Sequence, residues 1–142
     1  MNNKSAMEKK KVLFLCTHNS ARSQMAEGLL RALRGNRYEA YSAGTEPTAV
    51  SPYAVKVMAE IGIDISRHRS KSVDAFTSGS FDYVVTVCDN AKEACPFFPG
   101  GRKMLHESFE DPSTFAGGEE EITAGFRHIR NEIKGWIEET FL

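Results

Sequence analysis

A cysteine and an arginine lie six positions apart near the start of the chain, in the stretch Cys16-Thr-His-Asn-Ser-Ala-Arg22-Ser23. An apolar run, residues 12–15, comes directly before the cysteine. A loop between a buried strand and a helix can turn its backbone N–H groups inward, where they and the helix dipole attract an anion. A guanidinium adds two donors that match a pair of oxygens on a tetrahedral oxyanion. Because the same field favours thiolate, the segment predicts an oxyanion site that holds a nucleophilic sulfur.

The residues expected to surround the anion are those of the loop and of the helix start: Thr17, His18, Asn19, Ser20, Ala21, Arg22 and Ser23. The side chain of His18 is expected to face solvent. The alternative for this segment is a buried structural cysteine at a strand end, with Arg22 on a solvated helix face.

The other two cysteines, Cys88 and Cys95, are seven positions apart. A disulfide needs their Cα atoms within roughly 7 Å, so it forms only if the intervening segment bends or unwinds. They could be two unrelated cysteines, and a zinc site has little support because no histidine lies at ligand spacing. Together with Cys16, however, they suit a reductase, in which one thiol attacks the adduct sulfur and another passes the disulfide to an external dithiol.

Apolar patterning predicts the elements that position these groups. The expected strands are Val12–Cys16, Arg37–Ser42, Tyr83–Cys88 and Lys103–His106. The expected helices are Ser23–Arg34, a helix from an N-cap at Ser51 to a stop at Gly62, a short one over Val73–Phe76, and a long amphipathic one over Glu119–Phe141. The prolines and glycines after Cys95 predict a loop, and we expect the segment 88–99 to be more mobile than the sheet.

Strands that alternate with helices predict an α/β protein, a three-layer α/β/α arrangement around a four-stranded parallel sheet. With 142 residues the chain is expected to form a single domain over residues 11–142, preceded by a disordered tail over residues 1–10. Ligands of such sheets bind beyond the carboxyl ends of the strands. Cys16 and Cys88 both end predicted strands, so they should open onto the same rim.

Composition excludes several partners. The formal net charge of −1 favours neither nucleic acid nor an anionic membrane surface, and no apolar run approaches the roughly 18 residues of a membrane span. The polar N-terminus is unlike a secretory signal. An odd number of cysteines, three, fits reactive thiols in the cytoplasm better than a secreted disulfide scaffold.

The sequence resembles the thioredoxin-coupled arsenate reductases of the low-molecular-weight protein tyrosine phosphatase superfamily, from about Lys11 to the C-terminus. The matching motifs are Cys16-Thr-x-Asn19-Ser-x-Arg22-Ser23-Gln-Met-Ala-Glu27-Gly, Tyr41-Ser-Ala-Gly44, Gly62-Ile-Asp-Ile-Ser66, Val84-Val-Thr-x-Cys88, Cys95-Pro96 and Asp111-Pro112. The spacing of the three cysteines is the most specific of these matches. The resemblance implies a low-molecular-weight phosphatase-like fold and the reduction of arsenate to arsenite.

The same resemblance implies a role for each matching residue. Cys16 is the nucleophile, and Arg22 with the amides of residues 17–22 binds arsenate, with phosphate or sulfate as competitors. Asn19 and Ser23 hold the loop and stabilise the thiolate. Asp111 is the general acid. Without the resemblance, its place before Pro112 would suggest only a turn residue. Cys88 is the second thiol, and Cys95 closes the final Cys88–Cys95 disulfide for thioredoxin, the external reductant.

Two positions depart from the family: Lys71, and Glu107, which follows His106 where many relatives carry tryptophan. Some relatives bind potassium through an asparagine, a glutamate, a serine and an aspartate; Asn19, Glu27 and Ser42 match, but Lys71 replaces the aspartate. We expect its ammonium to replace the ion's charge and pair with Glu27, the alternative being a solvated surface lysine, and no metal or other cofactor to bind. Two other functions stay open: a tyrosine phosphatase that works through a cysteinyl-phosphate on Cys16, and an oxyanion sensor without turnover.

Overall fold

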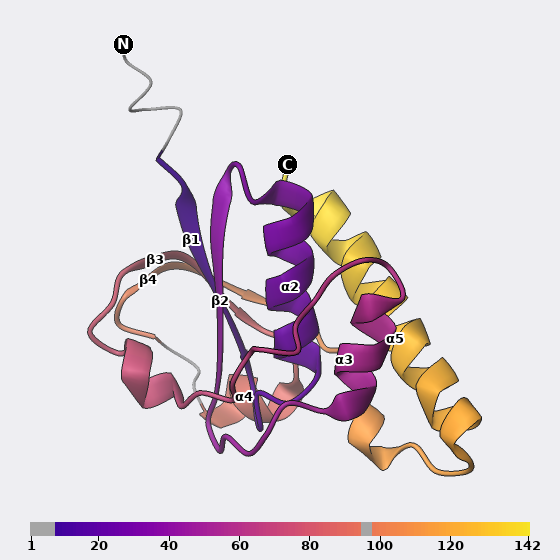
Figure 1. The fold of residues 1–142 in the computed structure, drawn as a ribbon. Helices are drawn as coiled ribbons and strands as arrows, with labels where there is room; N and C mark the ends of the chain where they lie inside the picture. The colour runs from indigo at the N-terminus through magenta and orange to yellow at the C-terminus, as the bar shows by residue number, and fades with distance from the viewer. Residues whose placement is uncertain (1–7, 95–97) are drawn as a thin grey trace.

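The computed structural model describes residues 8–94 and 98–142, which include every predicted site residue except Cys95. Figure 1 shows a parallel sheet with helices packed around it. The strands are β1 (Lys10–Cys16), β2 (Tyr38–Gly44), β3 (Phe81–Thr86) and β4 (Gly101–His106). The α-helices are α2 (Arg22–Arg34), α3 (Pro52–Ala59), α4 (Asp89–Ala94) and α5 (Glu119–Thr140), and short 3₁₀ helices η1 (Val73–Phe76) and η2 (Pro112–Thr114) complete the fold.

The sheet has the order β2-β1-β3-β4, and each neighbouring pair is parallel. β1 is therefore an inner strand, and its residues Val12 to Leu15 are fully buried, as the unbroken apolar run predicts. The order also sets the carboxyl ends of β1 and β3 next to each other, because Leu15 pairs with Thr86.

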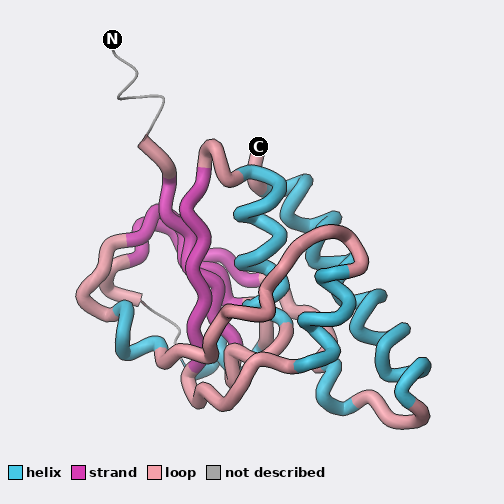
Figure 2. Tube along the Cα trace, in the orientation of Figure 1, coloured by secondary structure: helices cyan, strands magenta, loops and turns pink. Residues whose placement is uncertain are grey.

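The two faces of the sheet are covered differently, as Figures 1 and 2 show. Helices α2, α3 and α5 pack together on one face, where the ring of Phe14 meets that of Phe141 edge-on at 6.2 Å. Residues that follow one another along a strand point to opposite faces. Tyr41, which pairs with Leu13, accordingly lies on the other face and packs against Phe76 of η1. The three-layer α/β/α prediction is confirmed.

Most predicted elements are found within a few residues of their expected bounds, but four details were wrong. β1 begins at Lys10, which we had placed in the tail. β3 ends at Thr86, so Cys88 lies two residues beyond the strand rather than at its end. The residues after Cys88 form the helix α4, which was not among the predicted helices; the loop was expected only after Cys95. Ser51 is the N-cap of α3, but its hydroxyl makes no capping hydrogen bond.

α4 was missed because its six residues, Asp-Asn-Ala-Lys-Glu-Ala, contain no apolar period. Ala91 is buried in the core, whereas Asp89, Asn90, Lys92 and Glu93 are exposed. A helix of this length depends on tertiary contacts for its stability, since isolated helices this short are not stable in water.

Candidate active site

The loop after β1 turns its carbonyl groups outward. The segment after β2 takes them up, with Thr45 N–H donating to the Cys16 carbonyl (3.2 Å) and Glu46 N–H to that of Thr17 (2.7 Å). Further along, the N–H groups of Thr48 and Ser51 donate to the carbonyls of residues 18 and 20. Since the outer side of the loop is occupied in this way, its amides are free to face the interior of the loop, as an anion requires.

Asn19 fixes the shape of this loop. Its backbone has a φ of +50°, a left-handed conformation that asparagine tolerates better than most residues. The buried side chain donates from Nδ2 to Ser23 Oγ (2.8 Å) and accepts at Oδ1 from the Lys71 N–H (2.8 Å) and from Gln24 Nε2 (2.9 Å). One side chain therefore ties the loop both to α2 and to the segment before η1.

The sulfur of Cys16 accepts hydrogen bonds from two directions. The N–H of Asn19 donates to it at 3.2 Å, and Ser23 Oγ lies 2.8 Å away. Because Ser23 Oγ already accepts from Asn19 Nδ2, its own hydroxyl hydrogen is free to point at the sulfur. The thiol is buried, with only 2% of Cys16 exposed. Two donors aimed at a desolvated sulfur stabilise the thiolate.

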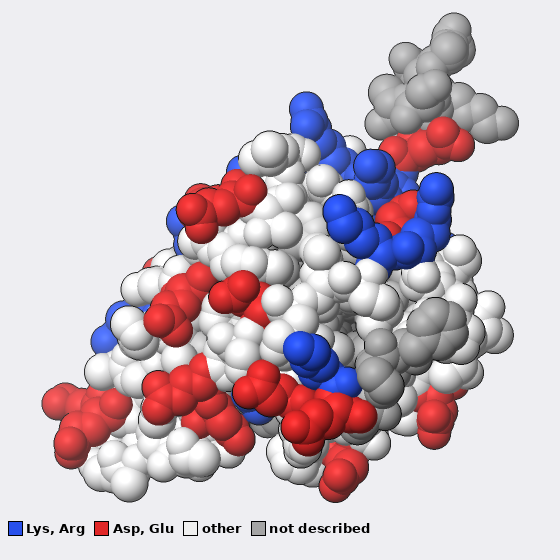
Figure 3. Space-filling model, turned by 180° about the vertical axis from the view of Figure 1, so that it is seen from behind, with Lys and Arg blue, Asp and Glu red and all other residues white. Residues whose placement is uncertain are grey.

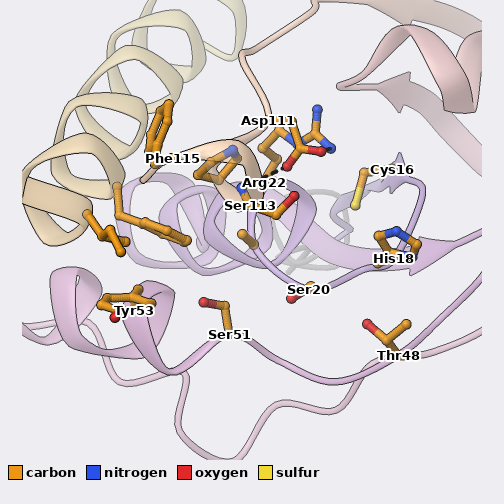
Figure 4. A pocket seen from close by; sticks show the side chains of 14 residues that line it. Cys16, His18, Ser20, Arg22, Thr48, Ser51, Tyr53, Asp111, Ser113 and Phe115 are labelled. Carbon is orange, nitrogen blue, oxygen red and sulfur yellow. Dashed lines mark hydrogen bonds and ion pairs between the residues drawn. The ribbon is translucent and has the colours of Figure 1, made fainter. Parts of the chain in front are cut away.

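Arg22 and Asp111 face each other across the mouth of the loop (Figure 4). Arg22 Nη1 donates to the carbonyl of Phe109 (3.1 Å), and its Nη2 lies 3.7 Å from Asp111 Oδ2. Burial raises the pKa of Asp111, but hydrogen bonding from Ser113 and the nearby charge of Arg22 outweigh it, so the pKa lies below its ordinary value. Asp111 is thus a carboxylate in this site, and it also caps η2, as its reading as a turn residue before Pro112 predicts.

A cavity of about 490 Å³ opens above Cys16 and Arg22 (Figure 4). One end carries the loop and Asp111, and the other is walled by apolar side chains, among them Tyr53, Phe115 and Phe126. A tetrahedral oxyanion fills only a small part of this volume. The cavity therefore has room for a group attached to the anion as well.

A second cavity, of about 380 Å³, adjoins the first and is lined in part by Cys88. Three residues line both cavities: His18, Arg22 and Asp111. The exposed ring of His18 is held by its Nδ1–H, which donates to the Glu46 carbonyl at 3.0 Å. Cys16 thus lines one cavity and Cys88 the other, and the two cavities share three lining residues.

Cys88 is the residue before α4, and its sulfur accepts from the N–H of Ala91 at 3.4 Å. On its other side the sulfur lies 3.5 Å from Thr17 Oγ1, a neighbour of Cys16 in the chain. The prediction that the two thiols share a rim is confirmed for Cys16 and Cys88. Cys95 falls outside the described residues.

A network of charged groups occupies the place where some relatives bind potassium. Glu27 accepts from Ser42 Oγ (2.5 Å) and Arg31 Nη2 (2.7 Å), and Lys71 Nζ lies 3.7 Å from it. Burial lowers the pKa of Lys71, and the charge of Glu27 offsets part of that effect. Within residues 8–94 and 98–142, no group of three or more His, Cys, Asp or Glu side chains is arranged to hold a metal ion.

Sequence reasoning missed two supports of the loop. Gln24 links it to the segment before η1, since its Nε2 also donates to the Arg69 carbonyl at 2.8 Å. Gly44 lets β2 approach the loop, because a Cβ there would lie 2.6 Å from the Thr17 carbonyl oxygen. The motif containing Gly44 was recognised, but nothing in the local sequence indicated which backbone it would meet.

Charge is distributed in patches over the surface. On the face in Figure 3, most basic side chains gather at the upper right, and acidic side chains predominate over the lower part. In the described part of the chain, no helix combines the length and the apolar character that a bilayer crossing requires.

The site is an oxyanion site of the phosphatase type. It combines a strand, a loop that begins with a cysteine, a helix that begins at an arginine, and a facing Asp-Pro. Residues 11–141 match the model of the low molecular weight phosphotyrosine protein phosphatase family, and the chain belongs to that family. It is 46% identical to the arsenate reductase of Halalkalibacterium halodurans over 127 residues, 89% of this chain and 91% of the relative.

Solved structures agree with this placement. A structure described as an arsenate reductase in the phosphate binding state superposes with a TM-score of 0.79 at 32% identity, covering 92% of this chain and 95% of the other. The thioredoxin-dependent arsenate reductase of Corynebacterium glutamicum gives a TM-score of 0.65 at 29% identity, covering 96% of this chain and 64% of the other.

Proposed function

We propose that this protein is an arsenate reductase that uses Cys16, Cys88 and Cys95 in sequence and is regenerated by thioredoxin. The observation that carries the proposal is the position of two thiols on one rim. Cys16 accepts from Ser23 and Asn19 inside the anion loop, and Cys88 lies 3.5 Å from the adjoining Thr17. The similarity to named arsenate reductases supports the same substrate.

In the first step, arsenate binds to the loop amides and to the guanidinium of Arg22. The Cys16 thiolate attacks arsenic and forms an As–S bond, and one oxygen leaves as water. Asp111 supplies the proton for that oxygen. Its pKa is low while it faces the uncompensated charge of Arg22; a bound dianion neutralises that charge and so raises the affinity of the carboxylate for a proton.

In the second step, the Cys88 thiolate attacks the sulfur of Cys16. An S–S bond forms, the As–S bond breaks, and its electron pair stays on arsenic, which leaves as arsenite. Arsenic(V) gains two electrons while two thiolates are oxidised to a disulfide. The hydrogen bond from Ala91 N–H and the neighbouring hydroxyl of Thr17 stabilise the attacking thiolate.

In the third step, Cys95 attacks Cys88, releases Cys16 as thiolate, and leaves a Cys88–Cys95 disulfide for thioredoxin. All six residues between these cysteines belong to α4. A helix of six residues rises about 9 Å, which exceeds the roughly 7 Å that a disulfide allows between Cα atoms. Disulfide formation therefore requires α4 to unwind, which exposes the bond to an external dithiol.

The test couples arsenate turnover to thioredoxin, thioredoxin reductase and NADPH. Wild-type protein is expected to consume NADPH when arsenate is added. Cys16→Ser should abolish consumption, whereas Cys88→Ser and Cys95→Ser should stop repeated turnover. A Cys95→Ser variant that cycles normally with thioredoxin contradicts the relay.

The apolar end of the large cavity favours a second candidate, hydrolysis of aryl phosphate esters through a cysteinyl-phosphate. This reaction needs Cys16, Arg22 and Asp111 but neither of the other cysteines. Hydrolysis of p-nitrophenyl phosphate should therefore survive Cys88→Ser and Cys95→Ser. Hydrolysis without any arsenate-dependent NADPH consumption would make the phosphatase the principal activity.

A further inference from the structure

The imidazole of His106 contacts two residues that flank Cys88 in the chain, one before it and one after it. His106 is the last residue of β4, and its Nδ1 lies 2.7 Å from Thr86 Oγ1 while its Nε2 lies 3.0 Å from Asp89 Oδ1. Thr86 ends β3 two residues before Cys88, and Asp89 begins α4 one residue after it. The relay proposed above assigns no task to this ring.

The hydrogen-bonding roles in this bridge follow from its ends. A carboxylate only accepts, so Nε2 carries the hydrogen that binds Asp89. In the neutral ring Nδ1 then accepts from the Thr86 hydroxyl. In the protonated ring Nδ1–H donates to the same oxygen, whose hydroxyl can turn to the Leu105 carbonyl at 3.4 Å. The bridge therefore persists in both states of the imidazole.

The bridge lies next in the chain to the contacts of the Cys88 sulfur. That sulfur is held between the N–H of Ala91, in the first turn of α4, and Thr17 on the anion loop. The Asp89 side chain is 74% exposed, whereas that of His106 is only 24% exposed and is anchored in the sheet. Asp89 thus gains a fixed partner, and the first turn of α4 is set relative to the ends of β3 and β4.

We propose that His106 is a positioning residue for the second thiol. By fixing both flanks of Cys88, it holds the sulfur beside Thr17, so that the thiolate is directed toward Cys16 when the arsenic adduct forms. The inference rests on the proposed relay and concerns only its second step. Binding of the oxyanion and attack by Cys16 do not involve His106.

The test isolates that step in a Cys95→Ser background, where only Cys16 and Cys88 remain. Reduced protein is mixed with saturating arsenate without any external thiol, quenched at intervals, and analysed by intact mass for the loss of two hydrogens and by arsenite release. We expect His106→Ala to slow disulfide formation about tenfold, the effect of losing one charge-assisted hydrogen bond. The arsenate concentration for half-maximal rate should not change.

Two variants separate positioning from general damage. His106→Gln retains a donor and an acceptor at the end of a similar side chain, so it should stay within about twofold of the parent. His128→Ala removes a histidine from α5 that is 69% exposed and also contacts a carboxylate, that of Glu132 at 3.3 Å; it should have no effect. Melting temperature and phosphate affinity, by calorimetry, verify that each variant is folded.

Disulfide formation at the parent rate in His106→Ala, or equal slowing in His106→Gln, overturns the inference. If His106→Ala does not fold, Asp89→Asn weakens the same bridge from its exposed end, and a parent rate there overturns it equally. Failure of the proposed function has a different signature, because the Cys95→Ser parent itself would then release no arsenite.

Discussion

Gly44 at the end of β2 lies against the carbonyl of Thr17, so closely that a Cβ on residue 44 would be 2.6 Å from that oxygen and 2.8 Å from the Asn19 nitrogen. Both neighbours are backbone atoms of the anion loop and cannot rotate away. The distance between β2 and this loop thus depends on the absence of a side chain at one position.

Gly44→Ala is therefore expected to destabilise the protein by about 1–3 kcal/mol, as overpacking against fixed atoms does, and to weaken phosphate binding. Chemical denaturation and calorimetry measure the two effects. Gly135→Ala is the matched control, because a Cβ at this position in α5 meets nothing within 4 Å. It should stabilise the protein by about 0.5–1 kcal/mol. Unchanged phosphate affinity in Gly44→Ala would show that the loop tolerates a shift of β2.

Ser23→Ala should slow the reaction of Cys16 with iodoacetamide about tenfold or more near neutral pH, because a hydrogen bond to a charged group contributes about 1.5–3 kcal/mol. The measurement uses a Cys88→Ser, Cys95→Ser background, in which Cys16 is the remaining thiol. Ser78→Ala, at an exposed turn, provides the control. An equal rate in Ser23→Ala would mean that the Asn19 amide alone maintains the thiolate.

His68 predicts a pH dependence of stability. Its Nδ1–H donates to Gln24 Oε1 (2.9 Å) and its Nε2 accepts from Arg31 (3.3 Å), which fixes the neutral ring. Burial lowers its pKa, Glu27 and Asp64 oppose this effect, and Arg31 and Lys71 add to it. Between its lowered pKa in the folded state and the unfolded value of 6.5, the unfolded chain binds more protons than the folded one, so stability is lost as the pH falls through this range.

His68→Gln should accordingly flatten the decline of the melting temperature below pH 6.5, although it lowers the melting temperature near neutrality. Thermal melts of both proteins over a pH series measure the slopes. Identical slopes would assign the acid sensitivity to other groups.

The position of Lys71 predicts that potassium does not stabilise this protein more than sodium does. Its ammonium lies 3.7 Å from Glu27 and already supplies positive charge there. The melting temperature should therefore be equal in potassium and sodium chloride at one ionic strength. Lys71→Asp restores an oxygen ligand beside Asn19, Glu27 and Ser42 and should make potassium more stabilising than sodium. Lys134→Asp, which removes a partly exposed lysine from α5, should not. Selective stabilisation of the wild type by potassium contradicts this expectation.

The sequence by itself was sufficient for the parts of this protein that depend on neighbouring residues. The apolar run before Cys16 predicted β1, the three- and four-residue steps from Glu119 predicted α5, and the spacing of Cys16 and Arg22 predicted the anion loop. Periodicity and turn chemistry act over a few residues, so they can be read from the chain directly.

Only the tertiary structure decided which distant groups meet. Arg22 and Asp111 are 89 positions apart, and their approach depends on the sheet order β2-β1-β3-β4. The polar helix α4 forms where Cys88 and the His106 bridge fix its first turn. Contacts of this kind arise from the packing of whole strands, whose order no local pattern specifies. For this reason the sequence offered Cys16, Arg22 and Asp111 as candidates, whereas their meeting at one cavity and the bridge beside Cys88 came only from the tertiary structure.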